Sequence, residues 1–220
     1  QQTQKFDCEQ PLEALAVTRD GKRFAAGGWG GKVRIYSLDK SSKEKPVEIN
    51  TGAEYVFALA FSPDGQELAI GNNAQPEFVS LWNAETGKRL RGLKGHTDAV
   101  LSVAYSKDGT QLLTGSYDKT ARLWNLAKGT SVDFVGHDWW VWSAMFSPDE
   151  QRIVTASQDG TVLVWPVASR KPSPPFLGHS GPVYSAAFSP DGKQIASASH
   201  DRKILLWNPA DLREQSLEQA

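Results

Sequence analysis

The sequence predicts an all-β protein built from five repeated, four-stranded antiparallel sheets. The first observation is a Gly-His pair followed 22 residues after the histidine by aspartate and 6 residues later by tryptophan. This pattern occurs three times, at His96/Asp118/Trp124, His137/Asp159/Trp165 and His179/Asp201/Trp207. The second observation is a turn of the type Ser-Pro-Asp-Gly that recurs every 41 to 44 residues, beginning at positions 18, 62, 106, 147 and 189. Self-similarity at such a period indicates a repeat architecture.

The third unit shows how one repeat is organised. Residues 99–105 are apolar and predict a first strand, which ends at the turn formed by residues 106–109. Residues 111–116, 120–125 and 130–135 predict the second, third and fourth strands. In the turn, serine suits the first position, proline presets φ at the second, and glycine takes the last. The five units are predicted to span residues 8–50, 51–94, 95–135, 136–177 and 178–220 of a single region, 1–220.

Some predicted strands are apolar at consecutive positions instead of alternate ones. Residues 162–164 (Val-Leu-Val) and 204–206 (Ile-Leu-Leu) are the clearest cases. Such strands are buried on both faces of their sheet. We therefore expect each sheet to be stacked between neighbouring sheets.

Composition excludes several classes of function. A formal net charge of −1 offers no basic surface for nucleic acid or an anionic membrane. A single cysteine, Cys8, excludes an intrachain disulfide framework. The sequence contains no apolar run of membrane-spanning length and no signal pattern at its N-terminus. We expect a soluble, cytoplasmic protein and, because the chain begins without methionine and within a unit, a piece of something longer.

The period, the four strands, the Gly-His opening and the closing tryptophan resemble the WD40 β-propeller family. The likeness covers nearly the whole chain, and its regular Ser-Pro-Asp-Gly turns are similar to bacterial WD40 arrays. The aspartate that usually follows the closing tryptophan is absent, since asparagine stands at positions 83, 125 and 208. The resemblance implies an all-β fold of radially arranged four-stranded blades, and a scaffold or sensor region attached to kinase, protease or nucleotide-binding switch domains.

The repeated histidine, hydroxyl and aspartate suggest two interpretations. On paper they have the chemistry of a catalytic triad, but they occur three times, and an enzyme needs one nucleophile. In WD40 proteins these positions form a hydrogen-bonded tetrad with the tryptophan, which satisfies the buried indole N–H. By that resemblance the structural tetrads are His96/Thr114/Asp118/Trp124, His137/Thr155/Asp159/Trp165 and His179/Ser197/Asp201/Trp207. We therefore predict a protein that is not an enzyme.

Units one and two lack the tetrad. Cys8, Ala26 and Gly30 stand at the matching positions of unit one, and unit two has Gly52 and a longer hairpin turn at residues 72–78. We predict that these two units open first. Four histidines spread over separate units do not predict a metal site, and the run at residues 27–32 lacks the outer residues of a phosphate loop. We expect no metal and no cofactor.

The resemblance also implies a partner-binding rim on the narrow face of the propeller. The rim positions are the third and fifth residues after the Gly-His histidine and the residue before the tetrad aspartate. Carried over, the candidate partner-binding residues are Trp29, Tyr55, Phe57, Tyr117, Trp140, Trp142, Gln158, Tyr184 and His200, with Pro11, Glu13, Ala99, Leu101 and Pro182 at the remaining rim positions. Such a patch suits a protein or peptide partner. The alternative is that Trp140 and Trp142 merely pack between neighbouring first strands.

The sequence does not decide whether the five units form a closed ring, because closed WD40 rings most often have seven blades. The five units form an open arc or part of a larger ring completed by other blades or chains, with residues 2–7 as the outer strand of a preceding blade. Alternatively, residues 2–7 close a five-bladed ring and residues 211–220 form a tail. The leading function is an interaction scaffold; the alternatives are a structural or oligomerisation element, or an enzyme that uses the central channel.

Overall fold

The computed structural model describes residue 6 and residues 8–39 and 45–210, all of which lie in strands, turns and loops. The first two sheets contain β1 (Leu12–Val17), β2 (Arg23–Gly28), β3 (Lys32–Ser37) and β4 (Val47–Asn50), then β5 (Val56–Phe61), β6 (Glu67–Asn72), β7 (Val79–Asn83) and β8 (Arg89–Leu93). The third contains β9 (Val100–Tyr105), β10 (Gln111–Ser116), β11 (Thr120–Asn125) and β12 (Thr130–Val135). The fourth and fifth contain β13 (Val141–Phe146), β14 (Arg152–Ser157) and β15 (Val162–Pro166), then β16 (Val183–Phe188), β17 (Ile195–Ser199) and β18 (Ile204–Trp207).

Every sheet is an antiparallel meander in which sequential strands are neighbours. The recurring turn joins the first two strands as the sequence predicts. In the second sheet the N–H of Gly65 donates to the carbonyl of Ser62 at 2.8 Å, and Gly65 has a left-handed φ of 71°. The hydroxyl of Ser62 donates to Asp64 at 2.6 Å and accepts from the N–H of Glu67 at 2.9 Å, which closes the turn from both sides.

The fourth and fifth sheets have three strands where four were predicted. Beyond β15, the residues at 172, 174 and 175 are prolines, which have no N–H to donate to a strand ladder. This segment follows β15 through two backbone bonds, from Ser173 N to Val164 O at 2.7 Å and from Phe176 N to Val162 O at 3.0 Å. The prediction of four strands is therefore wrong for the fourth sheet. Residues 211–220, the candidate tail, lie outside the described residues.

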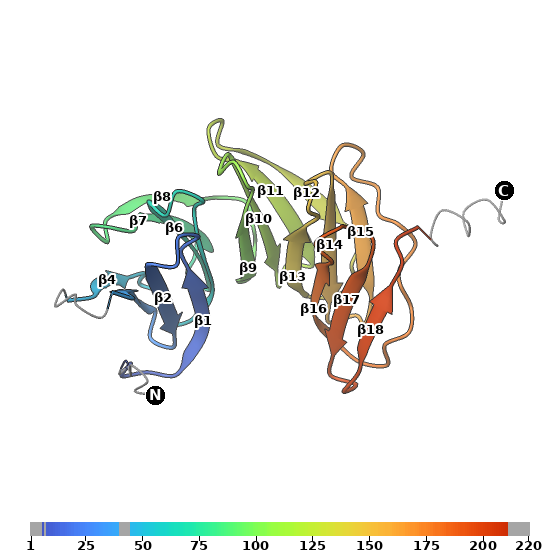
Figure 1. Ribbon diagram of the computed structural model, residues 1–220, viewed down its shortest axis with the longest axis horizontal. Coiled ribbons are helices and arrows are strands. Elements are labelled where there is room, and N and C mark those ends of the chain that lie inside the picture. Colours follow the sequence, from blue (N-terminus) through green and yellow to red (C-terminus); the bar gives the residue numbers. More distant parts are fainter. Residues whose placement is uncertain (1–5, 7, 40–44, 211–220) are drawn as a thin grey trace.

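The five sheets follow one another around an arc that does not close (Figure 1). The first sheet, in blue, and the fifth, in red, lie at opposite ends of it. A ring closed by five blades is therefore not what the structure shows. Phe6 packs on Phe24 and Tyr36 of the first sheet, with ring centroids 4.8 and 5.0 Å apart; apart from Phe6, the segment proposed as an outer strand, residues 2–7, lies outside the described residues.

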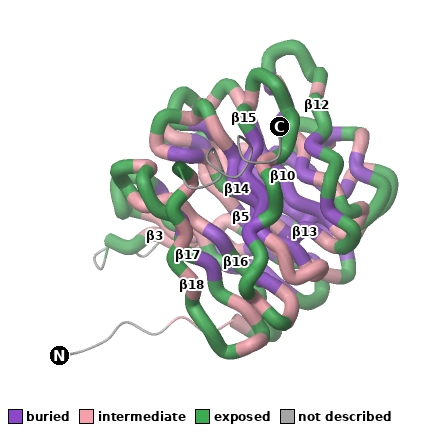
Figure 2. The backbone as a smooth tube through the Cα atoms, turned by 90° about the vertical axis from the view of Figure 1, so that its right-hand side faces the viewer, coloured by how far each residue is buried: buried purple, intermediate pink, exposed green. Residues whose placement is uncertain are grey.

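Apolar cores fill the four spaces between consecutive sheets. Between the fourth and fifth sheets, for example, Val162 and Val164 pack with Val183 and Ile195. Between the third and fourth sheets, Trp165 is completely buried. In the tube view, buried residues run along the inner strands, whereas the exposed residues are concentrated in turns and outer strands (Figure 2). Each inner sheet thus covers the apolar face of the next.

The two ends of the arc expose residues whose counterparts inside it are buried. In the fifth sheet Ile204 and Leu206 are 74% and 66% exposed, whereas Val162 and Val164 at the same positions of the fourth sheet are at most 5% exposed. The expectation that residues 204–206 are covered on both faces is therefore wrong, because the described residues supply no sixth sheet. At the other end Leu15 is 66% exposed, while its counterpart Ala186 is buried.

In the described part of the chain there is no helix long and apolar enough to cross a membrane.

Candidate interaction surface and structural tetrads

Four side chains meet inside the third sheet, between its first and third strands. The indole N–H of Trp124 donates to the hydroxyl of Thr114 at 3.0 Å. The same hydroxyl lies 2.7 Å from Nε2 of His96, and Nδ1 of His96 lies 2.6 Å from Oδ2 of Asp118. Every polar member of this chain, from the indole through the hydroxyl and the imidazole to the carboxylate, therefore has a hydrogen-bond partner.

The fourth and fifth sheets repeat this arrangement. In the fourth, Trp165 Nε1 lies 2.8 Å from Thr155 Oγ1, which lies 2.7 Å from His137 Nε2. His137 Nδ1 then lies 2.8 Å from Asp159 Oδ2. In the fifth, the corresponding three distances among Trp207, Ser197, His179 and Asp201 are 2.7, 2.8 and 2.9 Å. The structure thus brings together all twelve side chains assigned to tetrads.

The aspartate of each tetrad also fixes two turns. Asp118 accepts from the backbone N–H of Thr97, which enters the sheet, and from the N–H and hydroxyl of Thr120, which starts β11. Burial alone would raise the pKa of Asp118, but the hydrogen bonds from His96, Thr120 and Thr97 outweigh it and hold the pKa well below its ordinary value. The same causes lower the pKa of Asp159. Both carboxylates stay ionised and paired.

This geometry does not provide a working nucleophile. Thr114 and Thr155 are completely buried, and Ser197 is 2% exposed. Both nitrogens of His96 are engaged, so neither is free to take a proton from a substrate. The tetrads act on the fold by satisfying buried polar atoms and by anchoring the turns.

The second sheet replaces the tetrad with two shorter devices that the sequence analysis missed. The indole N–H of Trp82 donates to the hydroxyl of Ser80 at 2.8 Å, two residues earlier on the same strand. In the longer hairpin turn, Oδ1 of Asn73 accepts from the backbone N–H groups of Glu54 and Tyr55 at 3.1 and 2.9 Å. Asn73 therefore holds the entering chain as Asp118 does in the third sheet. The sequence did contain a signal for the first of these, namely a serine two residues before the closing tryptophan.

The first sheet closes its unit with ring packing. The hydroxyl of Tyr36 lies 3.7 Å from the sulfur of Cys8, which stands at the histidine position. The ring of Tyr36 stacks on Phe24 with centroids 4.9 Å apart. Burial, followed by contact with Cys8, raises the pKa of Tyr36. Aromatic stacking is found here at the place where the third, fourth and fifth sheets have a hydrogen-bonded tetrad.

An irregularity in strand pairing occurs at the same place in all five sheets. The pairing of the first strand with the second skips one residue near the start of the first strand. The skipped residues are Glu13, Phe57, Leu101, Trp142 and Tyr184. A bulge of this kind redirects a side chain away from the regular pleat. It places the fifth residue after each histidine position at the end of its sheet.

Three of these residues, Phe57, Trp142 and Tyr184, belong to a continuous line of rings, the aromatic row. Consecutive ring centroids lie 4.3 to 6.1 Å apart from one end to the other. Its members, in order, are Trp29, Tyr55, Phe57, Tyr117, Trp140, Trp142, Tyr184 and His200. The row crosses every sheet, although its members come from positions 29 to 200 of the chain.

Polar atoms of the row are paired across the first, fourth and fifth sheets. The N–H of Trp29 donates to Oε1 of Glu13 at 3.1 Å, and the N–H of Trp142 donates to Oε1 of Gln158 at 2.8 Å. The hydroxyl of Tyr184 lies 3.2 Å from Nδ1 of His200. These contacts orient the rings, most of which meet their neighbours edge to face.

Exposure varies along the row. Trp29, at one end, and Tyr184, next to His200 at the other, are 48% and 45% exposed. Trp140 and Trp142 are half-buried, with Trp140 stacked on Tyr117 at 4.3 Å. They pack between neighbouring first strands and also belong to the continuous surface. Ala99 and Leu101, the remaining rim positions of the third sheet, are buried beneath it.

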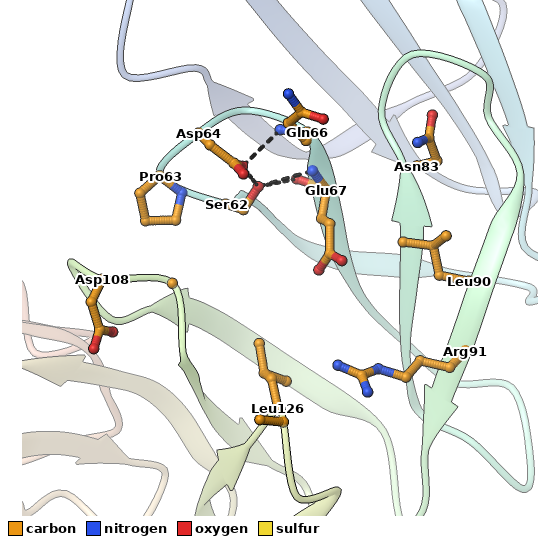
Figure 3. A pocket seen from close by; sticks show the side chains of 12 residues that line it. Ser62, Pro63, Asp64, Gln66, Glu67, Asn83, Leu90, Arg91, Asp108 and Leu126 are labelled. Carbon is orange, nitrogen blue, oxygen red and sulfur yellow. Dashed lines mark hydrogen bonds between the residues drawn. The ribbon is translucent and has the colours of Figure 1, made fainter.

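A separate cavity of about 670 Å³ lies between the second and third sheets, at the end opposite the aromatic row (Figure 3). Between the first and second sheets, and between the fourth and fifth, an arginine crosses to the next turn: Arg23 donates to the carbonyl of Gly65 at 2.6 Å, and Arg152 donates to that of Gly192 at 3.1 Å. At the cavity Glu67 stands at this position and accepts from the hydroxyl of Tyr105 at 3.4 Å. No arginine therefore crosses this space from that position.

The cavity does not assemble a catalytic group. Asp64 at its edge is held within its own turn by Ser62 and by the N–H of Gln66, as Figure 3 shows. Those two hydrogen bonds, the larger from Ser62, lower the pKa of Asp64. Among the described residues, no group of histidine, cysteine and acidic side chains is arranged to hold a metal ion.

Comparison with known proteins adds two findings. The family model described as WD domain, G-beta repeat matches residues 1–37, 87–125, 129–166 and 170–208, well over half of the chain. Protein groucho of Drosophila melanogaster is 28% identical over 132 residues, which are 57% of this chain and 17% of groucho. The chain thus spans less than a fifth of that relative. Most of the second sheet, which lacks the tetrad, falls outside the matched stretches.

Proposed function

Because this chain belongs to the WD40 repeat family, we propose that it is a non-catalytic interaction module that holds a protein or peptide segment against the aromatic row. The observation that carries the proposal is the unbroken line of ring contacts from Trp29 to His200. Tryptophan and tyrosine are enriched at the energetic centres of protein interfaces. Each offers a large apolar face and one hydrogen-bonding atom at little entropic cost.

The module serves as the scaffold or sensor region of a longer polypeptide in the cytoplasm. The similarity to part of groucho and the family's association with larger proteins support the first point. The single cysteine, which suits a reducing compartment, supports the second. The tetrads make the sheets that contain them rigid, so that the rings are already positioned before a partner binds.

The experiment is selection of peptides from a random displayed library on the wild-type chain, followed by affinity measurement with fluorescence anisotropy. Trp142→Ala and Tyr184→Ala are each expected to weaken binding of the selected peptides at least tenfold. Because Tyr184 is exposed, Tyr184→Ala should leave the melting temperature nearly unchanged. Val132→Ala, at an exposed position on β12, is the matched control and leaves binding unchanged. Asp159→Ala lowers the melting temperature while peptides still bind below it. Selected peptides that bind the two aromatic variants at full strength contradict the proposal.

A second candidate is a structural role in assembly, favoured by the exposed apolar faces at both ends of the arc. Other blades or chains that complete the ring would cover Leu15 at one end and Leu206 at the other. Mass measurement over a range of concentrations separates the two candidates. A monomer that binds selected peptides supports the interaction module, whereas growth of mass with concentration, abolished by Leu206→Lys, supports assembly.

A further inference from the structure

We infer that the segment held by the aromatic row is an extended chain carrying arginine side chains, bound where the row crosses the first three sheets. This inference rests on the proposed function and adds the chemistry of the partner. It starts from the charges beside the rings. In each of the first three sheets, one exposed carboxylate stands next to a ring of the row: Glu13 by Trp29, Glu54 by Tyr55, and Asp98 by Tyr117.

Each of these carboxylates interacts with a ring of the row or with the backbone beside it. Glu13 accepts from the indole N–H of Trp29 at 3.1 Å. The negative charge of Glu54 raises the pKa of Tyr55, and burial together with the charge of Asp98 raises that of Tyr117. Asp98 also accepts from the backbone N–H of Ala99 at 2.7 Å, which holds it at the entrance to β9.

These three carboxylates differ from other acidic groups on the same surface because they lack a cation. Glu9 and Glu48 both pair with Arg34, at 3.1 and 3.0 Å. Glu77 pairs with Arg89, and Asp133 pairs with Arg122 at 2.8 Å. Within the ranges that the structure describes, Glu13, Glu54 and Asp98 form no ion pair. An acidic surface with no internal counter-charge is complementary to a basic partner.

Arginine fits this combination of groups better than other side chains do. Its planar guanidinium stacks on an aromatic face while its N–H groups donate to a carboxylate at the ring's edge. The surface already contains one cation over an indole, since Nζ of Lys119 lies 5.7 Å from the ring centroid of Trp139. Lys119 extends from the β10–β11 turn toward Trp139, just before β13, so this cation lies on the fourth-sheet side of Glu13, Glu54 and Asp98. The basic segment therefore binds along the first three sheets.

The test uses three synthetic peptides of equal length that alternate glycine with arginine, glutamine or glutamate. Binding to the whole chain is followed by tryptophan fluorescence at low ionic strength. We expect the glycine–arginine peptide to bind at least tenfold more tightly than the glycine–glutamine peptide, and the glycine–glutamate peptide to bind least. Added salt should weaken the arginine peptide most.

Single substitutions locate the effect. Glu13→Gln and Asp98→Asn keep an oxygen that can accept from Trp29 and Ala99, respectively, so folding is preserved while the charge is lost. Each should weaken the arginine peptide about twofold to fivefold, as for one exposed ion pair. Glu85→Gln, an exposed glutamate in the turn between β7 and β8 at the other end of the sheets, is the matched control and should change nothing.

Each other outcome has a defined meaning. Equal binding of the arginine and glutamine peptides, lost in Trp142→Ala, overturns the charge inference and leaves the aromatic row as the docking surface. Equal weakening by Glu85→Gln and Glu13→Gln also overturns it, because attraction would then come from overall charge. Absence of binding by all three peptides overturns the inference as well, and the displayed-library experiment then decides the proposed function separately.

Discussion

Replacing Thr155 with valine is expected to destabilise the fourth sheet through a single lost hydroxyl. Thr155 is completely buried, and its oxygen joins the indole of Trp165 at 2.8 Å to the imidazole of His137 at 2.7 Å. Valine has nearly the same shape, so little packing is lost. It leaves one buried N–H and one buried ring nitrogen without partners. At about 1–3 kcal/mol for each of these two stranded groups, the free energy of unfolding should fall by about 2–6 kcal/mol.

The assay is urea denaturation followed by far-ultraviolet circular dichroism, with the melting temperature measured in parallel. For a chain of this size the expected loss corresponds to roughly 5–15 °C. Thr130→Val is the matched control, because Thr130 is exposed at the start of β12 and the same substitution there strands nothing. Its effect should stay within about 0.5 kcal/mol.

A double-mutant cycle with Trp165→Phe isolates the hydrogen bond from packing. Once the indole N–H is gone, loss of the hydroxyl strands only the histidine, so the two substitutions together should cost less than the sum of their separate costs by about 1 kcal/mol or more. Strict additivity, or a Thr155→Val effect no larger than that of Thr130→Val, would refute the reasoning that the tetrad stabilises the sheet by satisfying buried polar atoms.

Three further predictions concern pH, local opening and backbone conformation. Folding lowers the pKa of Asp159, so its ionised form stabilises the fold at a pH above the pKa that this group has in the unfolded chain. The melting temperature should therefore fall as the pH drops below about 4, and Asp159→Asn should make that fall less steep. Amides of β1–β8 should exchange hydrogen faster than those of β9–β15 by mass spectrometry, since the first two sheets lack the tetrad; equal protection would contradict this. Gly31→Ala should cost several-fold more stability than Gly52→Ala. Both glycines have a left-handed φ, but a methyl group on Gly31 would lie 2.1 Å from the carbonyl oxygen of Ala53, whereas a methyl group on Gly52 would meet no atom within 4 Å. Similar melting temperatures for the two variants would contradict this steric argument.

The strand pattern of the inner units was predictable because local chemistry specifies it. In the third unit, residues 99–105 predict a strand that the structure places at β9 (Val100–Tyr105), and the next three strands agree to the residue. Turns with serine, aspartate and glycine close through their own side chains, so they need no distant partner. The tetrads were predictable from the resemblance to WD40 proteins, because the spacing of their members recurs in three successive units and a buried indole requires an acceptor.

Other features depend on contacts between residues that no local pattern relates. Asn73 takes over a tetrad task in the second sheet because the longer turn brings it to the N–H groups of Glu54 and Tyr55, whereas Ser80 is a local partner two residues before Trp82. The three-stranded fourth sheet follows from prolines, which were visible in the sequence, but four strands were expected there from the repeat alone. Trp207 closes its unit like Trp165 yet is only partly buried, because it belongs to the last described sheet.

The sequence by itself determined the all-β class, the repeat, the positions of most strands and the residues of three tetrads. These depend on side-chain periodicity, turn preference and the need to satisfy buried polar atoms, which act over one unit of the chain. Only the tertiary structure decided that eight rings from five units form one line, that bulges in the first strands present three of these rings, and that the arc stays open with apolar faces at its ends. Those properties arise from the stacking of sheets, because the angle and distance between neighbouring units exist only after the units have packed together.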